Sequence, residues 1–140
     1  MEWHVAGIAK QSAHNWQLCK DIGLFGISTD GRKHRLDKVK KGDRIAIWQA
    51  GKGWIALVEA TSDTRPPVSK DETPWGGGIA RFGLVFPFKI LKEPKEPVEL
   101  KFVEFKQEKT GMSVFVLRKG FCSVPSDIGE KISAVIGAKN

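Results

Sequence analysis

An amide and an aromatic ring, Asn15 and Phe25, lie ten residues apart on either side of a glycine-containing turn. Helical spacing across residues 13–22 is followed by an extended stretch at 24–29, so a strand folding back along the helix would bring both side chains to one concavity. A planar heterocycle needs hydrogen bonds at its edge and an apolar plate against its face. The pair therefore predicts a site for a flat base.

A second plate is predicted at Trp75. It stands in the longest irregular segment, residues 63–79, which holds three prolines and three consecutive glycines. A loop of this length inside a compact domain is usually functional or disordered. Polar and glycine neighbours cannot bury an indole by themselves, so Trp75 is expected to be exposed. The other tryptophans inside expected elements, Trp3, Trp16 and Trp54, are interpreted as core residues.

The spacing of the reactive residues does not indicate catalysis, a metal site or a phosphate-binding loop. His4, His14 and His34 stand in unrelated contexts, and none pairs by spacing with a serine or cysteine nucleophile, although the fold could bring them together. The sequence has no HxxxH or CxxC cluster for a metal, and Gly76–Gly78 lacks the spacing of a phosphate-binding loop. We therefore expect no enzyme activity, no metal and no cofactor.

The charge balance favours a polyanionic partner. The chain has 140 residues, with 23 basic against 16 acidic side chains and a net charge of +7. Nucleic-acid phosphates are one such partner, and a solvated basic surface is the alternative. The candidate phosphate contacts are Lys10, Arg32, Lys33, Arg35, Lys40, Arg81, Arg118 and Lys119.

The elements that must position these residues are mostly short strands. Strands are expected at residues 3–9, 24–29, 44–49, 54–61, 81–91, 113–117 and 121–124, with helices at 13–22 and 125–137. Ser12 is the expected N-cap of the first helix, and Gly23 its terminating residue. Strands clustered as hairpins predict one α+β domain over residues 1–140: a small, mixed, mostly antiparallel β-barrel with peripheral helices, and no βαβ fold.

Composition also suggests a location. Cys19 and Cys122 have no paired spacing and are expected to be reduced and apolar in character. No signal peptide and no apolar run of 18 residues is evident, so a soluble cytoplasmic protein without a membrane partner is expected.

Several stretches taken in order resemble the EVE domain of the PUA-like superfamily, a relative of the YTH domain. The matching segments are WHVAGIA (3–9), HNWQLCKDIGLFGIS (14–28), KKGDRIAIW (40–48) and TPWGGG (73–78), followed by PVEL (97–100) and a closing strand and helix. The resemblance covers nearly the whole chain. It implies a PUA-like barrel.

The resemblance also implies roles for particular residues. YTH domains read N6-methyladenosine in RNA, and EVE domains are regarded as readers of modified bases. In YTH domains aromatic residues form a cage around the bound base. Phe25 matches the first of them, where the family usually has tryptophan, and the smaller phenylalanine ring offers a less electron-rich face. The implied base pocket comprises Gln11, Asn15 and the backbone at Gly26 for the base edge, Phe25 and Trp75 as plates, and Trp48 at the floor.

The expected function is a non-enzymatic reader that takes a flipped modified base into an aromatic pocket. By analogy with EVE domains, modified cytosine in DNA is preferred, and any further effect would come from a separate effector protein. Three alternatives stay open: a YTH-like reader of modified RNA, a PUA-like enzyme or small-molecule binder acting on a nucleoside, and a basic RNA-binding barrel indifferent to modification.

Overall fold

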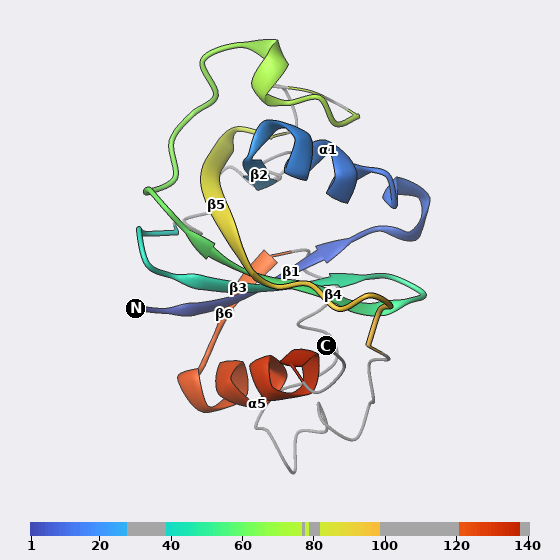
Figure 1. Cartoon of the computed structure of the whole chain (residues 1–140). Helices are drawn as coiled ribbons and strands as arrows, with labels where there is room; N and C mark the ends of the chain where they lie inside the picture. The colour runs from blue at the N-terminus through green and yellow to red at the C-terminus, as the bar shows by residue number, and fades with distance from the viewer. Residues whose placement is uncertain (28–38, 77, 79–81, 99–120, 138–140) are drawn as a thin grey trace.

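The computed structural model describes residues 1–27, 39–76, 78, 82–98 and 121–137. Figure 1 shows the elements in chain order. They are β1 (Trp3–Ile8), the 3-10 turn η1 (Lys10–Ser12), α1 (Asn15–Ile22), β2 (Leu24–Ile27), β3 (Arg44–Gln49), β4 (Gly53–Ala60), the 3-10 turn η2 (Lys70–Glu72), β5 (Leu84–Lys92), β6 (Phe121–Val124) and α5 (Ser126–Gly137).

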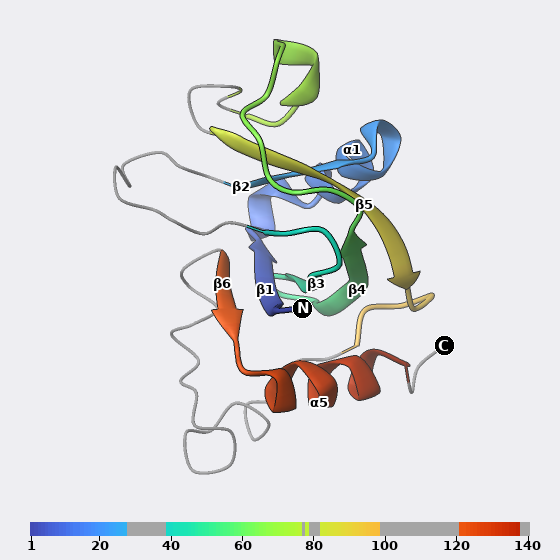
Figure 2. The same ribbon diagram turned by 90° about the vertical axis from the view of Figure 1, so that its left-hand side faces the viewer.

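The strands of the described residues form one curled, six-stranded mixed sheet in the order β2-β5-β4-β3-β1-β6. β1 and β3 are parallel, and every other neighbouring pair is antiparallel. The sheet curls into a half-barrel, with α1 and the β4–β5 loop at one end and α5 at the other (Figures 1 and 2). The predicted α+β, mostly antiparallel barrel class is confirmed. The strand predicted at 113–117 lies outside the described residues.

Alternation along the strands divides the core into two clusters. On β3, Ile45 and Ile47 belong to a first cluster that also contains Phe25 and Trp75. Their neighbour Ala46 belongs to a second cluster, which packs under α5. The α5 contact is tight, because a Cβ added to Gly129 would come within 2.3 Å of the Trp3 ring.

The first helix begins later than its sequence indicated. Lys10–Ser12 form a 3-10 turn, and α1 starts at Asn15 with His14 at its N-cap and no capping side chain. The prediction that Ser12 caps the helix is therefore wrong. The end was predicted correctly: Gly23 has φ 72°, and its N–H donates to the Cys19 carbonyl at 2.8 Å.

Candidate functional site

Trp75 is buried against a glycine and a phenylalanine. Its side chain is only 4% exposed, and a Cβ added to Gly26 would lie 2.5 Å from its ring. Phe82 covers it with a ring-centroid distance of 5.0 Å. The expectation of an exposed Trp75 is thus wrong, because bare backbone at Gly26 and the Phe82 ring supply the contacts that its sequence neighbours lack.

Phe25 and Trp75 meet in the same buried cluster. The Phe25 ring is paired with Phe86, its cross-strand partner on β5, at a centroid distance of 5.8 Å. Phe82, which the sequence interpretation assigned only to a strand, packs against this cluster beside Trp75. The structure therefore brings together Phe25, Gly26 and Trp75, and adds Phe82 as a third aromatic ring.

Two of the candidate residues, Asn15 and Trp75, each have a buried polar atom without a nitrogen or oxygen hydrogen-bond partner among the described residues. The atoms are the side-chain oxygen of Asn15, at the first position of α1, and the indole nitrogen of Trp75. A buried polar group without a partner costs about 1–3 kcal/mol. One atom accepts and the other donates, and the edge of a nucleobase offers groups of both kinds. A bound base could therefore satisfy what the protein leaves unsatisfied.

Cys19 forms an apolar wall of the same cluster, one turn along α1 from Asn15. Burial raises the pKa of its thiol to about 12, an effect that a side-chain hydrogen bond with Trp75 only partly counteracts. The thiol is therefore neutral at physiological pH. It behaves as a small hydrophobic side chain.

The polar segment before α1 is fastened to the β3–β4 hairpin. The amide of Gln49 donates to the carbonyl of Ala9 at 2.9 Å, immediately before the η1 turn that carries Lys10 and Gln11. Both of these side chains are exposed, and that of Lys10 lies against Gly51 in the hairpin turn. Gln11 lies four residues before Asn15, on the segment that leads into α1.

Trp48 is not brought to the other candidate residues. It packs against the second cluster, on the α5 side of the sheet, and a Cβ added to Gly7 would lie 2.7 Å from its indole nitrogen. Trp48 follows Ile47, which faces the first cluster, so strand alternation turns its side chain away. The prediction that Trp48 forms the floor of the same pocket is not supported.

Only two of the predicted phosphate contacts can be placed. Lys10 and Lys40 are both exposed. Arg32, Lys33, Arg35, Arg81, Arg118 and Lys119 lie outside the described residues. A phosphate path along the surface therefore stays a prediction.

Helix α1 is held to β5 through Trp16. The Trp16 indole N–H donates to the Glu93 carboxylate at 2.8 Å, and the ring stacks on Phe88 at a centroid distance of 5.7 Å. The Lys20 ammonium lies over the indole, 5.5 Å from the ring centroid, and bonds to the same Glu93 oxygen at 3.0 Å. This clamp fixes the helix that begins at Asn15, and the predicted burial of Trp16 is confirmed.

An ion pair between Arg65 and Glu72 holds the loop that precedes Trp75. Arg65 donates to both oxygens of Glu72, at 2.8 and 2.6 Å, and the Val68 N–H donates to Glu72 at 2.7 Å. The backbone of Arg65 is in turn bonded in both directions to Val85 on β5, at 2.9 and 2.8 Å. Glu72 therefore ties the segment leading to Trp75 onto the sheet. Hydrogen bonds from the Arg65 side chain and then the Val68 N–H lower the pKa of Glu72 to about 2.

We expect Glu72→Gln to lower the melting temperature in a pH-dependent way. Because the pKa is depressed in the folded state, the carboxylate contributes stability above its ordinary pKa of 4.5, and the contribution disappears as pH falls toward about 2. The variant should melt below wild type near neutral pH and match it in strong acid. Melting curves across this range check the prediction, with Glu130→Gln on the exposed side of α5 as control. Equal deficits at all pH values would contradict it.

Known structures share this fold. The YTH domain of Mmi1 in complex with RNA matches with a TM-score of 0.67 at 12% identity, covering 98% of this chain and 78% of that chain. The Toxoplasma CPSF4 YTH domain in complex with a 7-mer m6A-modified RNA matches with a TM-score of 0.65 at 16% identity, covering 99% and 93%. Rpa0253 from Rhodopseudomonas palustris matches with a TM-score of 0.62 at 16% identity, covering 100% and 96%.

At these identities the likeness shows the fold. The chain has the fold of these YTH domains. No protein-family model and no curated protein matches the sequence. Within the described part of the chain, no helix is long and apolar enough to cross a membrane.

Proposed function

We propose that this protein reads a modified nucleobase in a nucleic acid and has no enzymatic role. The observation that carries the proposal is the buried aromatic cluster of Phe25 and Trp75, together with buried polar atoms on Trp75 and Asn15 that have no nitrogen or oxygen partner among the described residues. Such atoms are costly unless a ligand uses them. The fold supports the same conclusion, because solved neighbours include YTH domains in complex with RNA and with m6A-modified RNA.

A base taken out of its strand would stack on the Trp75 indole and present its edge to Asn15 and the backbone near Gly26. Stacking on an aromatic side chain contributes about 1–3 kcal/mol per base. Trp75 is nearly fully covered without a ligand, so its ring must separate from Gly26 or Phe82 as the base enters. Phe25 and Phe86 would form the apolar wall behind it.

Two arguments bear on whether the protein binds DNA or RNA, and they point in opposite directions. The resemblance to EVE domains favours modified cytosine in DNA. The solved YTH neighbours that contain nucleic acid contain RNA, which favours modified RNA. We keep modified DNA as the first proposal and test both on equal terms.

The test is binding of fluorescent oligonucleotides that differ at one base. Matched pairs contain cytosine or 5-methylcytosine in DNA, and adenosine or N6-methyladenosine in RNA, each single- and double-stranded. A reader should favour the modified member of at least one pair, and its affinity should fall steeply with salt. Equal affinity within every pair would overturn the proposal. Tight binding of the free nucleoside with little salt dependence would favour the small-molecule alternative.

Asn15→Ala should reduce discrimination between the members of the preferred pair by about 2- to 13-fold, the equivalent of one hydrogen bond of about 0.5–1.5 kcal/mol. Gln17→Ala is the matched control, because Gln17 is an exposed amide on the same helix, and it donates to Asp21 within α1 at 2.8 Å. The measurement is the ratio of dissociation constants for the two oligonucleotides. An unchanged ratio in Asn15→Ala would remove Asn15 from the site.

A further inference from the structure

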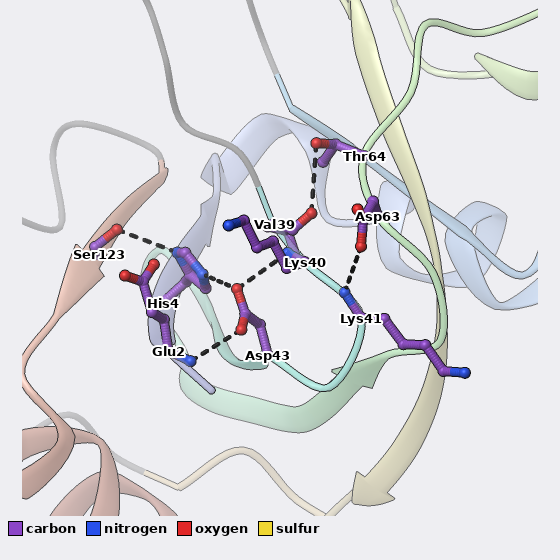
Figure 3. A network of polar contacts seen from close by, with 9 residues as sticks. All are labelled: Glu2, His4, Val39, Lys40, Lys41, Asp43, Asp63, Thr64 and Ser123. Carbon is purple, nitrogen blue, oxygen red and sulfur yellow. Dashed lines mark hydrogen bonds and ion pairs between the residues drawn. The ribbon is translucent and has the colours of Figure 1, made fainter.

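A second polar cluster lies where the N-terminal strand meets the turn before β3. Figure 3 shows Glu2 and Asp43 beside His4 there. His4 Nε2 is 3.0 Å from Asp43 Oδ2, and one ligand-type atom from each of the three side chains lies within 4.8 Å of the others. His4 and Asp43 are buried, with exposed fractions of 1% and 3%, whereas Glu2 is exposed. The cluster thus has a buried, hydrogen-bonded pair and one side chain open to solvent.

Both members of the buried pair are oriented by further hydrogen bonds. Asp43 accepts the Glu2 N–H at 2.9 Å and the Lys40 N–H at 3.0 Å. His4 Nδ1 is 3.4 Å from the Ser123 hydroxyl on β6. Outer hydrogen bonds of this kind, to the second ring nitrogen of a histidine and to a carboxylate, orient the ligands of metal sites.

We propose that Glu2, His4 and Asp43 bind a divalent transition-metal ion, Zn²⁺ being the best fit. One imidazole and two carboxylates suit zinc, which accepts four ligands, and leave one position for water. Calcium and magnesium prefer a shell made of oxygen ligands alone, so the His4 imidazole favours zinc over either of them. This inference does not depend on the proposed base-reading function.

The geometry needs little rearrangement. Ligand atoms about 2.0–2.2 Å from a tetrahedral zinc lie about 3.3 Å apart, close to the His4–Asp43 separation already present. Zinc would replace the hydrogen bond between His4 and Asp43. The ring N–H of His4 would then be at Nδ1, where it can donate a hydrogen bond to the Ser123 hydroxyl. Asp43 would keep its two backbone donors. Only the Glu2 side chain must close in, and its backbone is already bonded to Asp43.

The ion would tie residue 2 and β1 to the turn before β3. We therefore expect Zn²⁺ to stabilise the folded protein, since the three ligands converge only in the fold. Full-length, tag-free protein treated with chelator and dialysed should take up one Zn²⁺ per chain by calorimetry. Its melting temperature should rise with added zinc chloride and return to the starting value with chelator.

Glu2→Gln tests the assignment without disturbing the fold, because Glu2 is exposed and its backbone bond to Asp43 is retained. We expect at least a tenfold weaker Zn²⁺ affinity, since even loss of an outer hydrogen bond at a metal site costs about 10- to 100-fold. Glu130→Gln, an exposed glutamate on α5, should bind like wild type. No zinc-dependent stabilisation in wild type, or unchanged affinity in Glu2→Gln, would overturn the proposal.

Discussion

Replacing Trp75 with alanine is expected to weaken binding to the preferred modified oligonucleotide by about 5- to 150-fold. The range corresponds to the loss of one stacking face worth about 1–3 kcal/mol. Affinity for the unmodified oligonucleotide should change little, because phosphate contacts dominate that interaction. The measurement is anisotropy titration of both oligonucleotides at constant salt.

The matched control is Trp48→Ala. Trp48 is also a largely covered tryptophan, but it packs on the α5 side of the sheet, away from the candidate site. Both substitutions remove a large ring from a packed cluster, so melting curves establish that each variant is folded before binding is compared. If Trp48→Ala abolished discrimination while Trp75→Ala preserved it, the site would have been assigned to the wrong face.

Asp43→Ala should lower the free energy of unfolding by at least about 1–3 kcal/mol, the usual cost of leaving one buried polar group without its hydrogen bond. The carboxylate holds two backbone N–H groups and His4, and the substitution leaves all three without this partner. Urea unfolding near pH 7 measures the loss. Asp63→Ala is the control, because Asp63 is exposed and accepts the Lys41 N–H at 2.8 Å. Its loss should cost no more than about 1.5 kcal/mol.

The pH dependence of Asp43 has a definite sign. Burial alone would raise its pKa, but hydrogen bonds from the Glu2 N–H, His4 and the Lys40 N–H outweigh burial and lower the pKa below 3.8. Its contribution is therefore complete above the ordinary pKa and is lost as pH falls below it. A difference between wild type and Asp43→Ala that persisted undiminished in strong acid would contradict this account.

The strand pattern was largely readable from the sequence because it depends on local alternation. Residues 44–49 alternate clearly, and β3 has these bounds. Gly23 was identifiable as the helix terminator because a left-handed residue there favours glycine. The start of α1 was missed, since Ser12 has the right chemistry for a cap but lies in a 3-10 turn.

Contacts between segments far apart in the chain could not be predicted from the sequence. The burial of Trp75 depends on Gly26 and Phe82, whose proximity to it appears only once β2 and β5 pair. Alternation along β3 shows that Ile47 and Trp48 face opposite sides, yet nothing in the sequence says which side carries α5.

The cluster around His4 was missed for a similar reason. Asp43 lies 39 positions and Ser123 lies 119 positions away in sequence, so no local spacing motif contains them. Pairing of β1 with β3 and β6 brings them together.

The most direct test of the base-reading site is an NMR titration of the isotope-labelled protein with the free nucleosides 5-methyl-2′-deoxycytidine and N6-methyladenosine. We expect intermolecular NOEs from the base of the preferred nucleoside to the Trp75 ring, and a shift of the Trp75 indole N–H, whose nitrogen has no nitrogen or oxygen partner among the described residues of the unbound protein. The side-chain amide of Asn15 should shift with it. NOEs to Trp48 instead, or no effect on Trp75 and Asn15 at saturating nucleoside, would contradict the account.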